Sequence, residues 1–419
     1  MNHVGKRLRH FRKNLRMTQE ELAEGICNRS YVSQIEKGNV IPSPEILEQL
    51  AKRLQTDLRE LWSETETPVG FNQVEIQNAL RHIVNRIEAN DWEIARKWVY
   101  KLSGTQLNPA DKSIFLWAKG EIAQNDQRFE EVEPLYRSAI LLSREGDDPV
   151  VTVRALQSLG YFYCMTRQPK KAIPHLNEAL QLVTRFEISG LLRISLLYTS
   201  AMMHGNLEEY FSAIELLNQA VQLNQAYGTM YKSAMIFMGL AICHLHIKEY
   251  EKAEKYNLQA LEVFKLNPND RQEGNTYTNL AILYRVIGKY EKAEEFLNRS
   301  IEIHQKMSNR HWTINATNEL AQLYKHQGRY REAKELLESI IEKATTEHFL
   351  AEINLNYATV LNELDEVDQA LIHLEKSLEF FTRHQIKHYV IKAYRELVNI
   401  SIKSNDKEAI ARIYEKYDY

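Results

Sequence analysis

Residues 277–303, YTNLAILYRVIGKYEKAEEFLNRSIEI, and residues 316–343, ATNELAQLYKHQGRYREAKELLESIIEK, share one pattern of small, aromatic and apolar side chains. At the matching positions each residue type recurs: Ala281 with Ala321, Tyr284 with Tyr324, Gly288 with Gly328, Tyr290 with Tyr330, and Ala293 with Ala333. Self-similarity at a fixed period indicates stacked copies of one supersecondary unit.

The same frame runs along most of the chain. A small residue recurs every 37 to 41 residues, at Ala95, Val132, Ala172, Ala213, Ala253, Ala293, Ala333, Ala370 and Ala409. Twelve positions earlier stands a second small residue, except in the first and last copies: Ile83, Gly120, Gly160, Ala201, Ala241, Ala281, Ala321, Ala358 and Leu397. A single match would be weak evidence, whereas nine in phase predict a repeat array.

Two small side chains at a fixed spacing allow two antiparallel helices to approach each other closely. We expect a glycine to end the first helix of each unit and the aromatic pair to pack into the next unit. No unit buries its apolar face alone, so the units must stack. The pattern resembles the tetratricopeptide repeat (TPR), with helices longer than in copies of about 34 residues. It implies a right-handed superhelix of nine helix pairs over residues 73–419.

The beginning of the chain has a different pattern, typical of short helices joined by tight turns. Apolar residues at helical spacing predict a first helix over about residues 4–15. Thr18, followed three residues later by Glu21, is a capping box that starts a second helix, which a glycine ends. Asn28 is a suitable N-cap for a third helix, because its side-chain oxygen can accept from a free backbone N–H.

A fourth helix is expected to begin at Ser43-Pro44, and a last turn with Leu58, Leu61 and Trp62 to complete a small core. The stretch SETETPVGFN has little to bury and predicts a linker. We therefore expect an all-α chain with three parts: a helix-turn-helix domain at 1–62, a linker at 63–72 and a TPR domain at 73–419.

The third predicted helix has a polar outer face. Arginine can hydrogen-bond guanine or phosphate, glutamine can read adenine, and the N–H groups that start the second helix can hold a phosphate. The candidate DNA-binding residues are Thr18, Gln19, Asn28, Arg29, Ser30, Tyr31, Ser33, Gln34 and Lys37. A basic patch without acids precedes them, formed by Lys6, Arg7, Arg9, Arg12, Lys13 and Arg16. The alternative is a packing module with a solvated polar face.

Residues 17–54, MTQEELAEGICNRSYVSQIEKGNVIPSPEILEQLAKRL, resemble the DNA-binding domain of the phage-repressor-like (XRE) family over their whole length. The resemblance implies that the helix after Asn28 is the recognition helix and lies in the major groove of double-stranded DNA. One such domain makes too few contacts for specific binding, so we expect a dimer that reads a palindromic operator.

The first helices of TPR units line the inner surface of the superhelix, where an extended peptide can bind. An asparagine amide donates and accepts together, so it matches a peptide backbone unit. The candidate peptide-binding residues are Arg154, Gln157, Tyr161, Tyr198, Asn275, Asn279, Asn315, Asn318, Asn354 and Asn356. For each of them the alternative is an ordinary solvent-exposed position on a helix, with no role in peptide binding.

Composition narrows the classes of function. No run of about 18 apolar residues predicts a membrane span, and the N-terminus lacks the apolar segment of a secretory signal. The isolated Cys27, Cys164 and Cys243 are expected to be buried thiols in the cytoplasm. The sequence has no phosphate-binding loop, serine-hydrolase, zinc-protease or dinucleotide motif, so we expect no cofactor and no metal.

An XRE-type domain followed by nine TPR units resembles, over the entire chain, the peptide-pheromone-responsive Rap/Rgg/NprR/PlcR/PrgX class of Firmicutes, and its NprR-like members most. That resemblance implies a quorum-sensing transcriptional regulator. Such a protein binds a short signalling peptide in its TPR groove and rearranges as a homodimer or tetramer. Two alternatives remain. One is a further activity that dephosphorylates a sporulation response regulator, to which no residue of this chain can be matched; the other is a plain adaptor.

Overall fold

The structure is a computed structural model that describes residues 3–15, 17–40, 42–54, 56, 61, 72–266, 268–344, 346–384, 386–403 and 407–416. Within these ranges every helix or strand element is an α-helix, so the all-α prediction is confirmed. The chain forms two compact units, Met1–Ala155 and Leu156–Tyr419. Leu58, Trp62 and all of the predicted linker except Asn72 lie outside the described residues.

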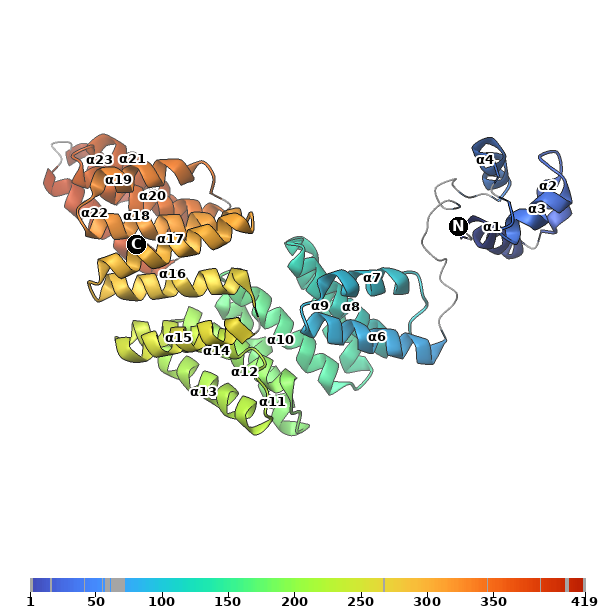
Figure 1. Ribbon diagram of the computed structural model, residues 1–419. Coiled ribbons are helices and arrows are strands. Elements are labelled where there is room, and N and C mark those ends of the chain that lie inside the picture. The colour runs from blue at the N-terminus through green and yellow to red at the C-terminus, as the bar shows by residue number, and fades with distance from the viewer. Residues whose placement is uncertain are drawn as a thin grey trace. The chain divides into compact units, whose positions relative to one another are not determined.

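The described residues of the first unit contain two groups of helices and the start of helix α10 (Figure 1). The short N-terminal helices are α1 (His3–Asn14), α2 (Gln19–Ala23), α3 (Arg29–Glu36) and α4 (Pro44–Arg53). The longer helices that follow are α6 (Gln73–Glu88), α7 (Trp92–Leu102), α8 (Pro109–Asn125) and α9 (Phe129–Glu145). The boundary between the two units falls inside α10 (Pro149–Met165).

The second unit continues the alternation of helices to the end of the chain. Its helices are α11 (Pro169–Arg185), α12 (Leu191–Asn206), α13 (Tyr210–Ala226), α14 (Ser233–His246), α15 (Tyr250–Leu266), α16 (Asp270–Val286), α17 (Tyr290–Lys306), α18 (Arg310–His326), α19 (Tyr330–Ile341), α20 (Glu347–Glu363), α21 (Val367–Arg383), α22 (Lys387–Lys403) and α23 (Lys407–Lys416). With α6–α10, they give nine helix pairs within the described residues, as the repeat frame predicted.

The four N-terminal helices form a small core of their own. Its fully buried side chains include Leu8, Leu22, Val32, Leu47 and Leu61, which come from all four helices and the turn after them. The predicted caps are present. The Thr18 hydroxyl accepts from the N–H of Glu21, the Glu21 carboxylate accepts from the N–H of Thr18, and side-chain oxygens of Asn28 and Ser43 cap α3 and α4.

The small residues of the repeat frame lie where the paired helices meet. Those of the second helices, from Ala95 to Ala370, are completely buried. A Cβ on Gly120 would lie 2.5 Å from the ring of Tyr136, and one on Gly160 would lie 2.5 Å from a methyl of Leu176. Since real Cβ contacts are longer than this, glycine is required at both positions.

Glycine is not the general residue of the turns between paired helices, which corrects our expectation. A residue with positive φ does occupy each of the first eight turns, but only Gly288 and Gly328 are glycines. The other six are Asn90, Gln127, Arg167, Glu208, Lys248 and Asp365. The left-handed conformation is therefore kept, while the residue type is not.

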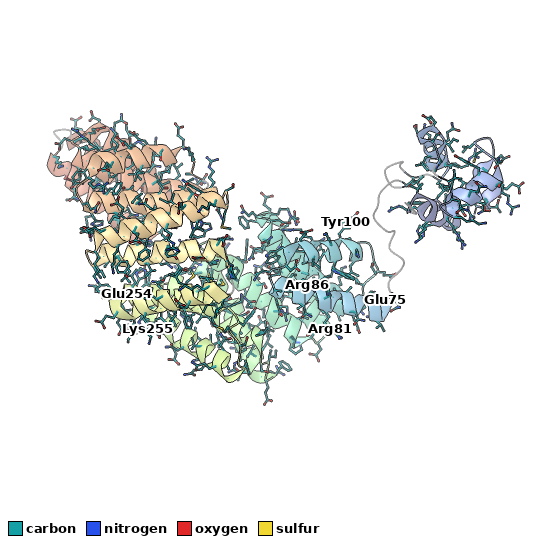
Figure 2. The ribbon with its side chains drawn as sticks, viewed as in Figure 1. Glu75, Arg81, Arg86, Tyr100, Glu254 and Lys255 are labelled. Carbon is teal, nitrogen blue, oxygen red and sulfur yellow. The ribbon has the colours of Figure 1, made fainter. Side chains whose placement is uncertain are left out.

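The two positions of the aromatic pair behave differently. Tyr210, at the second position, stacks on His246 of α14 in the next unit with ring centres 4.4 Å apart, as expected. Tyr284 and Tyr324, at the first position, reach back to the preceding unit, which is a second correction. The Tyr284 hydroxyl donates to Glu254 of α15 at 2.5 Å (Figure 2 labels Glu254), and the Tyr324 hydroxyl donates to Glu294 of α17 at 2.8 Å. Both tyrosines thus join the first helix of one unit to the second helix of the unit before it.

Candidate DNA-binding helix and first-helix face of the repeats

Helix α3 is held against the N-terminal core by one side and turns a polar side to solvent. Val32 and Ile35 are 0% and 1% exposed and anchor the helix. Arg29, Ser30 and Gln34 are exposed, as is Lys37 just after the helix end. The side chains that could hydrogen-bond base edges therefore stand on a helix whose own position is fixed by packing.

Two of the predicted DNA-binding residues have structural duties at helix starts. The Asn28 side-chain oxygen accepts from the N–H of Tyr31 at 2.8 Å, and the Thr18 hydroxyl accepts from the N–H of Glu21 at 3.2 Å. Tyr31 and Ser33 are half-buried. Thr18 and Asn28 thus cap the starts of α2 and α3. The exposed polar face of α3 is therefore narrower than the sequence predicted.

A buried ion pair that the sequence did not reveal joins α1 to α3. Glu36 accepts from Arg12 Nε at 2.6 Å, from Arg12 Nη2 at 2.9 Å and from Gln19 Nε2 at 2.8 Å. Burial alone would raise the pKa of Glu36, but the hydrogen bonds and charge of Arg12 and the hydrogen bond of Gln19 lower it below its ordinary value. Arg12 therefore does not belong to the exposed basic patch, and the Gln19 amide nitrogen faces Glu36.

The first helix of each pair is an even-numbered helix, from α6 to α22. We call the surface formed by the partly exposed side chains of these helices the first-helix face. Its helices are neighbours in the second unit, where α12, α14, α16, α18, α20 and α22 follow one another. Side chains bridge these neighbours directly: Asn356 Nδ2 donates to Asn318 Oδ1 at 3.0 Å, and Gln157 Nε2 donates to the Thr199 hydroxyl at 2.8 Å.

Arg154 is the predicted peptide-binding residue that lies in the first unit. Its Nη1 is 2.5 Å from Glu88 Oε1, and its guanidinium lies over the ring of Trp117 at 5.0 Å. An arginine that stacks on a ring and pairs with a carboxylate is held in one orientation. The other candidates lie in the second unit.

Tyr161 and Tyr198 are both half-buried. Burial raises the pKa of the Tyr198 phenol, and Lys232 Nζ lies 5.8 Å from the centre of its ring. The Tyr198 ring therefore keeps some accessible surface, while its hydroxyl group is poorly solvated.

The six predicted asparagines do not share one surface. Asn279, Asn315 and Asn356 are half-buried on the first-helix face, and Asn318 is 2% exposed beneath Asn356. Asn275 is 9% exposed, and its side-chain oxygen is buried without a hydrogen-bond partner among the described residues.

Asn354 differs from the expectation. Its Nδ2 donates to the Leu350 carbonyl at 2.8 Å, and its Oδ1 lies 2.6 Å from Nδ1 of His373 on α21. The side chain therefore faces the second helix of its own unit, where both ends of its amide are occupied. Its place in the frame is four residues before the small residue, and on a helix this is the side that the partner helix covers.

Apolar residues of the first-helix face were missed by the sequence reasoning. Met202 and Ile282 are half-buried, and Ile242 is 39% exposed. Each follows directly after the small residue of its first helix. Reading that one position in every copy of the frame would have found them.

The C-terminal half of the first-helix face is charged instead. Arg285 Nη2 of α16 lies 2.9 Å from Glu319 Oε2 of α18, with side chains only 12% and 16% exposed. Glu319 Oε1 also accepts from Gln322 Nε2 at 3.0 Å. On α20, Glu352 accepts from the Tyr389 hydroxyl of α22 at 2.5 Å. The face thus changes from apolar in its middle units to ionic in its last units.

No helix in the described part of the chain is long and apolar enough to cross a membrane. Among the same residues, no three His, Cys, Asp or Glu side chains are grouped so as to hold a metal ion.

Comparison with family models gives two matches. A helix-turn-helix model matches residues 8–61, and a tetratricopeptide-repeat model matches residues 192–266, 232–306 and 272–346. No curated protein sequence matches the chain.

Solved structures that share its fold include the following three. One is the apo form of the quorum sensor NprR from B. thuringiensis, which is 16% identical with a TM-score of 0.61 over 82% of this chain and 98% of that one. A Rap protein complexed with Competence and Sporulation Factor is 17% identical, with a TM-score of 0.58 over 81% and 100%. NprR in complex with its cognate peptide NprX is 12% identical, with a TM-score of 0.55 over 83% and 90%. The predicted fold of the Rap/NprR/PlcR class is therefore confirmed.

Proposed function

We propose that this protein is a quorum-sensing transcriptional regulator that binds double-stranded DNA through α3 and a short signalling peptide on the first-helix face. The carrying observation is the combination in one chain of a rigidly seated α3 with an exposed polar side and a repeat fold shared with NprR and Rap structures. Two of those structures hold a peptide or a signalling factor. The protein would act in the cytoplasm.

On the DNA side, Arg29, Ser30 and Gln34 are the residues we assign to base and phosphate contacts, with Lys37 adding a phosphate contact. A guanidinium and an amide are the two side-chain groups that form bidentate pairs with guanine and adenine. Gly25 and the caps of α2 and α3 hold the helix pair in the arrangement that places one helix in the major groove.

On the peptide side, the first-helix face supplies two kinds of contact. Met202, Ile242 and Ile282 offer apolar surface to side chains of a peptide, and asparagines of the later units offer amides to its backbone. Asn279, Asn315 and Asn356 are partly accessible, so they are better candidates than Asn354.

We assign DNA binding to residues 1–62, and both peptide binding and self-association to residues 73–419. Residues 63–72 are the proposed linker between these domains. A homodimer or tetramer would present two DNA-binding domains to a palindromic operator. A peptide that binds one arrangement of the subunits more tightly than another changes the DNA affinity by the ratio of its two affinities.

The test is selection of genomic DNA fragments by the purified full-length protein, with and without the small-peptide fraction of spent culture medium. We expect enrichment of a palindrome whose recovery changes with the peptide fraction. Enrichment that ignores the fraction would contradict the peptide part of the proposal. No enrichment in either condition would contradict the DNA part.

A further inference from the structure

Within the second unit, the charged end of the first-helix face has a cation whose hydrogen-bonding capacity is not used. Arg285 is 12% exposed, and its Nη1 is buried with no hydrogen-bond partner among the described residues. Its other terminal nitrogen approaches Glu319 Oε2 at 2.9 Å, but that oxygen also lacks a properly oriented hydrogen bond. A buried guanidinium donor without a partner is costly, and such a group in a native fold calls for an acceptor.

A second cation lies beside it. Lys325 of α18 is half-buried, and no hydrogen bond or ion pair to a described residue satisfies its ammonium group. Burial, followed by the positive charge of Arg285, lowers the pKa of Lys325 below its ordinary value, although Glu396 and Glu319 act in the opposite sense.

The two carboxylates nearby each accept hydrogen bonds from neighbouring amides. Glu396, 7% exposed, accepts from Asn362 Nδ2 at 2.8 Å and from Asn399 Nδ2 at 3.3 Å. Glu319 accepts from Gln322.

Charges of both signs act on Lys325. Arg285 and Lys392 disfavour its charged form, whereas Glu396 and Glu319 favour it. The neighbouring His326 does not add a positive charge at neutral pH, because burial and the charges of Arg285 and Lys325 lower its pKa.

We propose that Arg285 and Lys325 form a carboxylate-binding subsite of the peptide site, which takes either the C-terminal carboxylate of the peptide or an Asp or Glu side chain. This inference rests on the proposed function. Arg285 Nη1 and Lys325 Nζ supply two charge-assisted donors to the incoming group. Glu319 holds the Arg285 fork in place from the other side. The apolar residues of the middle units then contact the rest of the peptide.

The repeat frame places these cations close to the apolar residues of the first-helix face. Arg285 and Lys325 both stand four positions after the small residue of their first helices, Ala281 and Ala321, whereas Ile242 and Ile282 stand one position after theirs. The cations thus lie about one helical turn beyond the apolar row.

The experiment is affinity selection of random heptapeptides on the full-length protein, read by mass spectrometry. Four libraries are compared: free acid or C-terminal amide, each with and without Asp and Glu. We expect the amide library that lacks Asp and Glu to be retained at least about tenfold less than the others, since a charge-assisted pair is lost. Retention of the free acid without Asp and Glu identifies the C-terminus as the ligand. Retention of the amide with Asp or Glu identifies a side chain.

The matched variants are Lys325→Gln, which is expected to reduce retention of the carboxylate-containing peptides at least about tenfold, and Arg331→Gln as the control. Arg331 is an exposed residue of the second helix α19. Equal retention of all four libraries, or an unchanged Lys325→Gln, would overturn the subsite and leave peptide binding intact. If no library is retained at all, peptide binding itself is refuted, and the subsite with it.

Discussion

Replacement of Arg12 by methionine tests the buried ion pair that joins α1 to α3. The Arg12 and Glu36 side chains are 11% and 3% exposed, and the arginine provides two of the three hydrogen bonds to Glu36. Removing one partner of a buried pair leaves an uncompensated charge and costs about 3–5 kcal/mol. A domain of about 60 residues has a total stability of similar size. We therefore expect α1–α4 to be mostly unfolded in this variant at neutral pH.

The measurement is amide hydrogen exchange of the full-length protein, resolved by peptide. Protection of α1–α4 should fall by about two to three and a half orders of magnitude, while α12–α21 exchange as in the wild type. The double variant Arg12→Met/Glu36→Met removes both charges and should recover most of the protection. A loss of less than about 1 kcal/mol in the single variant would refute the reasoning. So would a double variant no more stable than the single one, because the damage would then not come from the unpaired carboxylate.

Four further outcomes follow from positions described above. Arg29→Ala with Gln34→Ala should abolish sequence-specific DNA binding, at about 1–3 kcal/mol per bidentate contact, while the circular dichroism stays unchanged; equal operator affinity by fluorescence anisotropy would contradict the assignment. Asn279→Ala, at a partly accessible residue of the first-helix face, should weaken the response to peptide but not peptide-independent DNA binding in the same assay. Gly160→Ala should lower the free energy of unfolding by about 1–3 kcal/mol through overpacking, and an unchanged Tm would show that the helices can move apart. Burial lowers the pKa of His304 to about 4, so between about pH 6.5 and 4 this histidine binds a proton in the unfolded chain but not in the folded protein. The free energy of unfolding should therefore fall as the pH drops through this range. Urea titration should show a smaller fall in His304→Phe.

Much of the fold was predictable because its signals are local or periodic. The capping box at Thr18 and the N-cap at Asn28 depend on residues three positions apart, so they could be read directly and were confirmed. The repeat frame gained its strength from nine copies, and the burial of its small residues follows from the same packing in each copy.

The candidate sites were less predictable, for physical reasons. Arg12 and Glu36 are 24 positions apart in sequence, and nothing in either local pattern shows that they meet. Asn354 and Asn356 differ by two positions, yet on a helix this turns one side chain toward α21 and the other toward α18. A residue can therefore be assigned to the first-helix face only if its position in the repeat frame is known to the single residue, because a shift of two positions changes the helix that it faces.

The left-handed turns between paired helices have a consequence for how such an array evolves. Eight turns keep the positive φ while six of them use Asn, Gln, Arg, Glu, Lys or Asp. Within this chain the backbone conformation is therefore kept from one turn to the next, while the side chain differs. A unit closed by such a turn can be duplicated or deleted whole without any matching change in its neighbours' turns. Loss of a single residue within the turn would instead shift the register of the two helices that it joins.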